Sequence, residues 1–227
     1  MAATTTQPDT RRILRFTKTE RVAHWVNAGL FAVVMLTGAV LKDIGGLSGT
    51  VGHRELVRFL HVYCGLAIPV AFVAAYAPRW GKALRLDVSR INRWSPGDLR
   101  WLRTFGRDRS VKLDKFNPGQ KLNAAFVAAA AIVMVATGLI MAAGSIFPWL
   151  GTFPDNTKTG ATFVHDAFAL FIWMAVLGHI YLAFNDSDAL RSMTRGDIST
   201  RWARAKRPLW YDEQVGSNPQ SEGTEAG

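Results

Sequence analysis

Four long runs without any Asp, Glu, Lys or Arg divide the chain. They cover residues 22–41, 59–77, 122–149 and 167–184. A helix that crosses a hydrocarbon core of about 30 Å needs about 20 residues, so each run is long enough, and Gly144 or Pro148 can end the third helix early. Membrane-spanning strands would instead alternate apolar and polar residues over about ten positions, a pattern that is absent here. The sequence therefore predicts an all-α integral membrane protein, folded as a four-helix bundle.

The runs also divide the chain into three parts. A first segment, 1–21, is followed by a membrane domain, 22–184, and a last segment, 185–227. Within the membrane domain we expect helices at about 22–41, 56–77, 121–144 and 162–184, with a basic loop at 78–120. The first run is longer than the roughly 7–15 residues of a signal-peptide core, so we expect it to be retained. The tail after about 214 is polar and lacks aromatic residues, which predicts disorder.

Basic residues are unevenly distributed about the four runs. Lys and Arg number 27, against 17 Asp and Glu, for a net charge of +10. Of these 27, 23 lie before the first run, between the second and third, or after the fourth; the other four are Lys42, Arg54, Arg58 and Lys158. This asymmetry predicts that both termini face the cytoplasm. The charge then reflects topology and attraction to anionic lipid headgroups, not binding of nucleic acid.

Four of the five histidines lie at two matching depths of the predicted bundle. His165 and His179 are 14 residues apart on the last helix, about 3.9 turns and about 21 Å, so they share one face at opposite depths. In the predicted topology His24 lies at the inner depth with His179, and His61 lies at the outer depth with His165. His53 precedes the second helix among charged residues, and we do not expect it to be a ligand.

Two histidine pairs at two depths are what two haems b require, since each iron takes two axial imidazoles from facing helices. Gly38 lies 14 residues after His24, on the same face at the outer depth, and would give a haem room. Glycines in membrane helices also simply permit close packing, which is the alternative for Gly38. Single histidines can cap helix ends, and a transporter could relay protons through them. Structural zinc is disfavoured because no compact four-ligand cluster is visible. The single cysteine, Cys64, excludes a disulfide framework and cysteine-ligated clusters.

Several segments together resemble a known family. They are RxxHW at 21–25, the Thr-Gly segments at 36–38 and 136–138, His61, FNPGQK at 116–121, the His165 and His179 pair, and RWARAKRPLWYDE at 201–213. These segments are similar to the gamma subunit of membrane-bound respiratory formate dehydrogenase, a cytochrome b, and the similarity extends over about residues 13–213. The histidine spacing is shared more loosely with other di-haem cytochromes, such as the b subunits of membrane hydrogenases.

The resemblance implies a place in the bacterial cell inner membrane and an electron path to a quinone. Electrons would come from an iron–sulfur beta subunit, served by a molybdenum or tungsten alpha subunit that oxidises formate outside the membrane. They would pass through an outer haem held by His61 and His165, and then an inner haem held by His24 and His179. The resemblance also implies a quinone contact at Asn117, with Gln120 and Lys121 as nearby candidates. The alternative is that Gln120 caps a helix and Lys121 marks the membrane boundary.

The chain lacks any recognisable ligand for molybdopterin and any cysteine cluster. We therefore expect it to contribute only the quinone-reducing half of a formate:quinone oxidoreductase. Two alternatives remain open from the sequence. The chain could serve a membrane hydrogenase, or it could be a stand-alone di-haem cytochrome that oxidises quinol.

Overall fold

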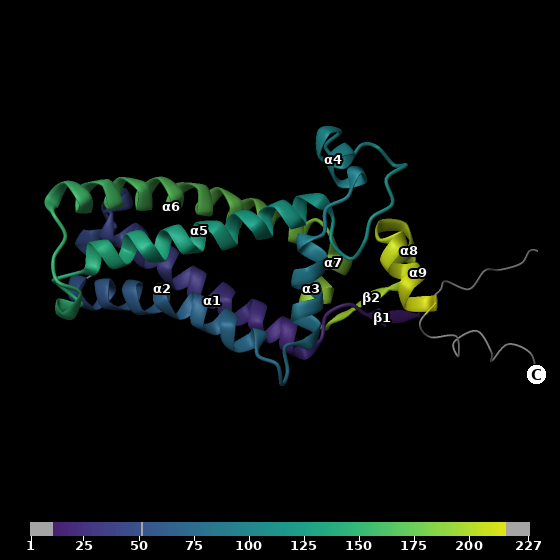
Figure 1. Ribbon diagram of the computed structural model, residues 1–227, viewed down its shortest axis with the longest axis horizontal. Helices are drawn as coiled ribbons and strands as arrows, with labels where there is room; N and C mark the ends of the chain where they lie inside the picture. The colour runs from purple at the N-terminus through teal and green to yellow at the C-terminus, as the bar shows by residue number, and fades with distance from the viewer. Residues whose placement is uncertain (1–10, 51, 217–227) are drawn as a thin grey trace, which may run out of the picture.

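Four long helices dominate the computed structural model, which describes residues 11–50 and 52–216 (Figure 1). They are α1 (Lys18–Leu41), α2 (Arg54–Tyr76), α5 (Pro118–Ala142) and α6 (Asp155–Phe184). All four are long and apolar enough to cross a membrane. This confirms the expected four apolar helices of a multi-pass membrane protein.

Shorter elements connect and extend the long helices. They are β1 (Arg12–Leu14), the 3-10 helix η1 (Ile44–Thr50), α3 (Lys82–Asn92), α4 (Pro96–Arg103), the 3-10 helix η2 (Pro148–Leu150), α7 (Ser187–Thr194), β2 (Asp197–Ser199), α8 (Thr200–Lys206) and α9 (Pro208–Gly216). The loop expected at 78–120 therefore contains two helices, α3 and α4. The disordered tail expected after about 214 falls mostly outside the described residues, and α9 continues to Gly216.

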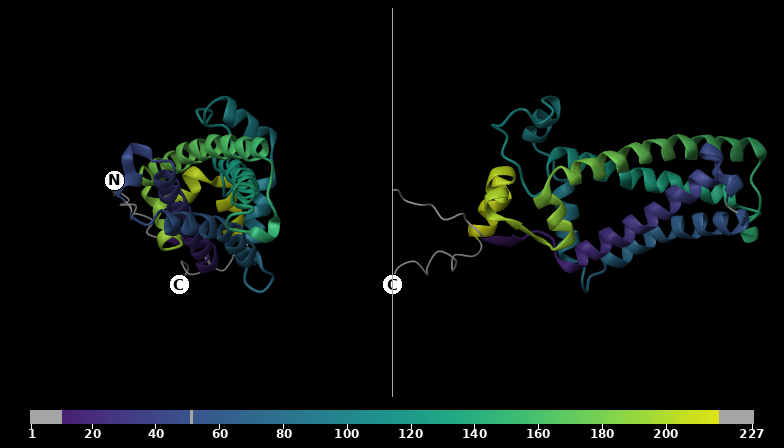
Figure 2. Two further views of the ribbon diagram at one scale, coloured as in Figure 1. Left: turned by 90° about the vertical axis from the view of Figure 1, so that its left-hand side faces the viewer. Right: turned by 180° about the vertical axis from the view of Figure 1, so that it is seen from behind.

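The long helices form two hairpins that lie side by side. Helix α1 packs mainly on α2, and α5 packs mainly on α6, while α2 and α5 make the main contact between the hairpins. Figure 2 shows the same arrangement from the end and from behind. We call the end that holds η1 and η2 the connector end, and the end that holds β1, α3, α4 and α7 to α9 the terminal end (Figure 1).

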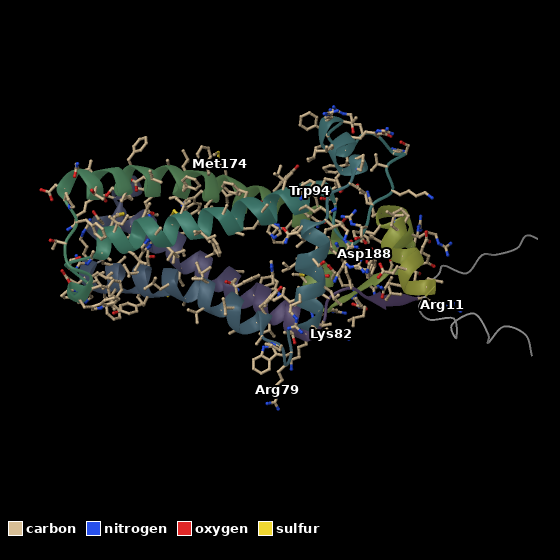
Figure 3. The ribbon with its side chains drawn as sticks, viewed as in Figure 1. Arg11, Arg79, Lys82, Trp94, Met174 and Asp188 are labelled. Carbon is tan, nitrogen blue, oxygen red and sulfur yellow. The ribbon has the colours of Figure 1, made fainter. Side chains whose placement is uncertain are left out.

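The terminal end has a small hydrophobic core of its own. Strand β1 pairs antiparallel with β2, with Ile13 opposite Ile198, although the two lie far apart in the sequence. Ile198, Ala203 and Trp210 are buried together, and Ile13 packs against them. In Figure 3 nitrogen and oxygen atoms gather at this end, around the labelled Asp188, whereas the long helices carry mostly carbon. The segments before and after the four-helix domain thus pack together at this end, around a small hydrophobic core with polar side chains outside it.

All four long helices begin earlier than their charge-free runs, and α5 and α6 show why. Helix α5 starts at Pro118, a favoured first position because proline has no N–H to leave unpaired. Helix α6 starts at Asp155, and the hydroxyls of Thr159 and Thr162 bond back to carbonyls one turn earlier. Polar first turns of this kind are invisible to a search for charge-free runs. They extend both helices beyond the predicted 121–144 and 162–184 at their first ends.

Candidate functional site

The two histidines predicted for the outer depth face each other between the hairpins. His61 comes from α2 and His165 from α6, and their ring centres lie 6.2 Å apart with the ring planes at 60°. Both residues lie nearer the connector end, because α2 and α6 both begin there. The structure thus brings together the pair that the depth argument joined.

The two histidines predicted for the inner depth form a second pair of the same kind. His24 of α1 and His179 of α6 have ring centres 6.1 Å apart, with the planes at 62°. His24 lies in the second turn of α1 and His179 in the last turns of α6, both at the terminal end. The bundle therefore holds two imidazole pairs near its two ends.

Both spacings fit a metal held between two imidazoles. One ion bound between two imidazoles, with metal–nitrogen bonds of about 2.0–2.1 Å, would place the two ring centres about 6.3 Å apart. The observed 6.1 and 6.2 Å agree with that distance. Within the described residues no group of three or more His, Cys, Asp or Glu could hold a metal ion. Paired imidazoles without further protein ligands fit haem iron, whose other four ligands belong to the porphyrin, better than zinc.

A glycine and a threonine adjoin each histidine of the connector-end pair. A Cβ on Gly38 would lie 3.2 Å from Cε1 of His61, and one on Gly138 would lie 3.6 Å from Cε1 of His165. Thr37 Oγ1 lies 3.0 Å from Nδ1 of His61, and Thr137 Oγ1 lies 2.8 Å from Nδ1 of His165. Gly38, predicted as a haem-packing position, lies against the ring of a candidate ligand. The contacts of the two threonines with the histidine rings were not predicted, although the repeated Thr-Gly pair in the sequence was a signal that could have indicated them.

The RxxHW motif ties the terminal-end pair to α7. Arg21 donates to the carbonyl of Thr194 at 2.6 Å, and Trp25 Nε1 donates to the carbonyl of Met193 at 2.9 Å. These bonds come from α1 on either side of His24. They fix the rotation of α1 relative to α7. Helix α7 directly follows α6, the helix that carries His179.

The FNPGQK segment forms the start of α5. Asn117 is the N-cap, accepting from the N–H of Gln120 at 2.8 Å, while Gln120 Oε1 accepts from the N–H of Asn117 at 3.0 Å. Lys121 is buried and bonded to Asp98 at 3.0 Å and to the carbonyl of Arg93 at 2.8 Å. The helix-cap alternative for Gln120 is therefore present. Lys121 is occupied by an ion pair that holds α4 against α5.

A buried charge cluster joins three separate segments at the terminal end. Lys115 Nζ bonds both oxygens of Asp87 at 2.7 Å and Glu20 Oε1 at 3.2 Å, and all three side chains are almost fully buried. The carbonyl of Lys115 accepts from Arg15 at 3.0 Å and from Arg207 at 3.2 Å. Burial lowers the pKa of Arg15 to about 9 and that of Arg207 to about 10. The cluster links α1, α3 and the loop before α5.

Stability should fall with rising pH through the titration of Asp87. Burial, reinforced by a hydrogen bond with Glu20 and opposed by Lys115, raises the pKa of Asp87 to about 8. The unfolded chain has an ordinary Asp pKa of about 3.9, so between about pH 4 and 8 the folded state holds the additional proton and loses stability as pH rises. We expect the thermal unfolding temperature of the purified protein in detergent to fall from pH 6 to pH 8.5, and Asp87→Asn to flatten that slope.

The control for this titration is Asp108→Asn, because Asp108 is only partly buried and its hydrogen bonds with Ser110 hold the pKa of its carboxyl below the usual range. It should leave the slope over pH 6–8.5 unchanged. An equal slope in wild type and Asp87→Asn would contradict the assignment of the proton to Asp87.

The arrangement of paired histidines agrees with the family comparison. Residues 15–196 match the family model described as prokaryotic cytochrome b561, which is most of the chain. The chain belongs to the prokaryotic cytochrome b561 family. Membership implies that the chain binds haem b.

Similar proteins carry more specific names. The chain is 27% identical over 211 residues to the formate dehydrogenase cytochrome b556 subunit of Haemophilus influenzae, covering 90% of this chain and 84% of that one. It is 26% identical to the cytochrome b556(Fdn) subunit of the nitrate-inducible formate dehydrogenase of Escherichia coli K12, covering 89% and 92%. It is 25% identical to the cytochrome b556(fdo) subunit from the same strain, covering 88% and 92%. These relatives confirm the resemblance inferred from the motifs.

Proposed function

We propose that this cytochrome b561-family chain is the membrane subunit of a respiratory formate dehydrogenase and binds two haems b. His61 and His165 hold one haem, and His24 and His179 hold the other. Each haem supplies a reversible one-electron carrier. Electrons enter from an iron–sulfur subunit at the connector end and leave to a quinone at the terminal end. The observation that carries the proposal is the pair of imidazole–imidazole separations, 6.1 and 6.2 Å, at the two ends of one bundle.

The direction of the path rests on charge asymmetry. Apart from Lys42, Arg54, Arg58 and Lys158 near the connector end, the Lys and Arg residues lie in the segments that lead to the terminal end. Basic residues concentrate on the cytoplasmic side of membrane proteins. The terminal end therefore lies on the cytoplasmic side of the inner membrane. The connector end faces the periplasm, where the iron–sulfur and molybdenum or tungsten subunits of the complex lie.

Among the three candidates for a quinone contact, Asn117 is favoured over Gln120 and Lys121. Its Oδ1 accepts from the N–H of Gln120, which leaves the Nδ2 amide to donate to a quinone carbonyl. Gln120 likewise uses Oε1, which accepts from Asn117 and Arg207, and keeps its amide N–H groups for a ligand. Lys121 is committed to Asp98 and acts by holding the helix start in place. A quinone reduced here takes its protons from the cytoplasmic side, which makes electron transfer across the bundle electrogenic.

The first experiment combines a spectrum with a partner inventory. The protein is purified in mild detergent with its co-purifying subunits, and a dithionite-reduced minus oxidised spectrum and a pyridine haemochrome count are recorded. We expect two haems b per chain, together with an iron–sulfur subunit and a molybdenum- or tungsten-containing subunit that oxidises formate. Haem-free protein that is correctly inserted would overturn the electron-transfer function. It would favour a transporter or anchor in which the histidines relay protons.

The partner inventory separates the remaining electron-transfer functions. A nickel-containing partner that oxidises hydrogen would replace formate dehydrogenase with a membrane hydrogenase. Two haems in a chain that purifies alone and oxidises quinol would identify a stand-alone cytochrome. The names of the relatives favour the formate complex among these three.

A further inference from the structure

The two hairpins treat their connector-end histidines in the same way. In each hairpin a threonine on the first helix contacts the Nδ1 of a histidine on the second. The distances are 3.0 Å from Thr37 to His61 and 2.8 Å from Thr137 to His165. The next residue in each case is a glycine, Gly38 or Gly138, against the Cε1 of the same ring. This Thr-Gly device occurs once in each hairpin, at matching depth.

The hydrogen-bond inventory decides which atom donates. Each threonine hydroxyl has one proton, and it is directed to a backbone carbonyl one turn earlier: Thr37 to Val33 at 2.6 Å and Thr137 to Val133 at 2.7 Å. The hydroxyl oxygen must therefore accept from the histidine, which carries its proton on Nδ1. The Nε2 lone pair of each ring is then free to bind iron. The donated bond also makes the ring a stronger electron donor.

The terminal-end pair has no such support. Across residues 11–50 and 52–216, the structure contains no hydrogen bond to a ring nitrogen of His24 or His179. Nearby polar groups are used elsewhere. Trp25 donates to the carbonyl of Met193, and the amide of Asn27 donates to the carbonyl of Ala23. The two imidazole pairs have nearly the same spacing but differ in their hydrogen bonds. Threonines bond the Nδ1 atoms of the connector-end pair, and no described residue bonds a ring nitrogen of the terminal-end pair.

We propose that Thr37 and Thr137 are positioning residues that lower the reduction potential of the iron held by His61 and His165 below that of the iron held by His24 and His179. This inference rests on the proposed function. A stronger imidazole donor stabilises Fe(III) relative to Fe(II), because the oxidised ion carries more charge. With this order of potentials, one electron would pass downhill from a haem held by His61 and His165 to a haem held by His24 and His179. No proton moves and no bond changes in this step.

The test is a spectroelectrochemical titration of the purified complex carrying Thr37→Val, Thr137→Val, or both. Valine keeps the branched shape and removes the acceptor. We expect two redox components in the wild type, and only the lower one to rise in potential. In the double variant, the ratio of oxidised to reduced haem in the lower-potential component should fall about tenfold at a fixed potential. This corresponds to a rise of about 59 mV in the reduction potential of a one-electron couple. The upper component should not move.

Matched variants separate the hydrogen bond from general packing. Thr162 of α6 makes the same backward bond, to the carbonyl of Lys158 at 2.9 Å, and makes no hydrogen bond with a histidine among the described residues, so Thr162→Val should leave both components in place. Thr37→Ser and Thr137→Ser keep the hydroxyl and should titrate like the wild type. Thr37→Ala and Thr137→Ala remove the hydroxyl without a methyl against the ring. The alanine variants provide the same test if the valine variants bind less haem.

Three results would overturn the proposal: no shift in fully haem-loaded valine and alanine variants, equal shifts in both components, or a shift confined to the higher-potential component. Two haems with unshifted potentials would leave the proposed function standing and remove the role of the threonines. A wild-type complex without haem b would instead remove the proposed function itself.

Discussion

Replacement of His61 by alanine is expected to remove one haem b per chain and leave the other. An alanine cannot bind iron, and a haem held by one remaining imidazole, His165, loses half of its protein ligation. His165→Ala should have the same effect, since the two rings form one pair at 6.2 Å. His24→Ala and His179→Ala should each remove the other haem. The pyridine haemochrome count should fall from two to one in each variant, and double variants across the pairs, such as His24→Ala with His61→Ala, should contain none.

The chain supplies its own control for these substitutions. His53 is exposed at the N-cap of α2, eight residues before His61, and its side chain makes no cap hydrogen bond. His53→Ala should keep two haems and the wild-type spectrum. Full haem content in both His61→Ala and His165→Ala, with normal membrane insertion, would disprove the assignment of this pair as axial ligands.

The pairing of the histidines was accessible from the sequence because it depends on few physical quantities. Helix rise and the approximate ends of the charge-free runs place His24 with His179 and His61 with His165. The ring separations of 6.1 and 6.2 Å bring the same residues together. Depth along a helix follows from counting residues, and errors of one or two positions at the helix ends do not change the pairing.

Contacts that depend on rotation and long-range closure were not accessible in this way. Whether Thr37 faces His61 depends on how α1 is rotated against α2, which side-chain packing decides. Strand β1 forms because it pairs with β2, which lies far away in the sequence. A strand of three residues has too little local pattern to predict such a pairing. The alternatives for Gln120 and Lys121 could not be ranked before the cap and the pair with Asp98 were seen. Apolar pattern thus fixes helices and depth, while polar contacts at helix ends need the assembled structure.

Replacement of Lys115 by methionine is expected to destabilise the terminal end strongly. Lys115 is the cation between Asp87 and Glu20, and all three are buried. With Asp87 protonated at neutral pH, the cluster is close to neutral, and methionine would leave the Glu20 carboxylate buried without its cation. Removing one partner of a buried pair costs about 3–5 kcal/mol. The thermal unfolding temperature of the purified protein should fall accordingly, with earlier proteolysis of the segments around β1 and α3.

Two variants show whether that loss comes from charge. Lys112→Met removes an exposed lysine from the same loop and should change the unfolding temperature little. Glu20→Gln added to Lys115→Met should recover much of the lost stability, because the uncompensated carboxylate is then gone and the amide can still bond Thr17. Equal unfolding temperatures for Lys115→Met and Lys112→Met would show that the cluster contributes nothing beyond surface charge. Because α1, α3 and the loop before α5 meet at Lys115, loss of the cluster should also loosen the start of α1. Haem at His24 should then be lost at a lower temperature than haem at His61.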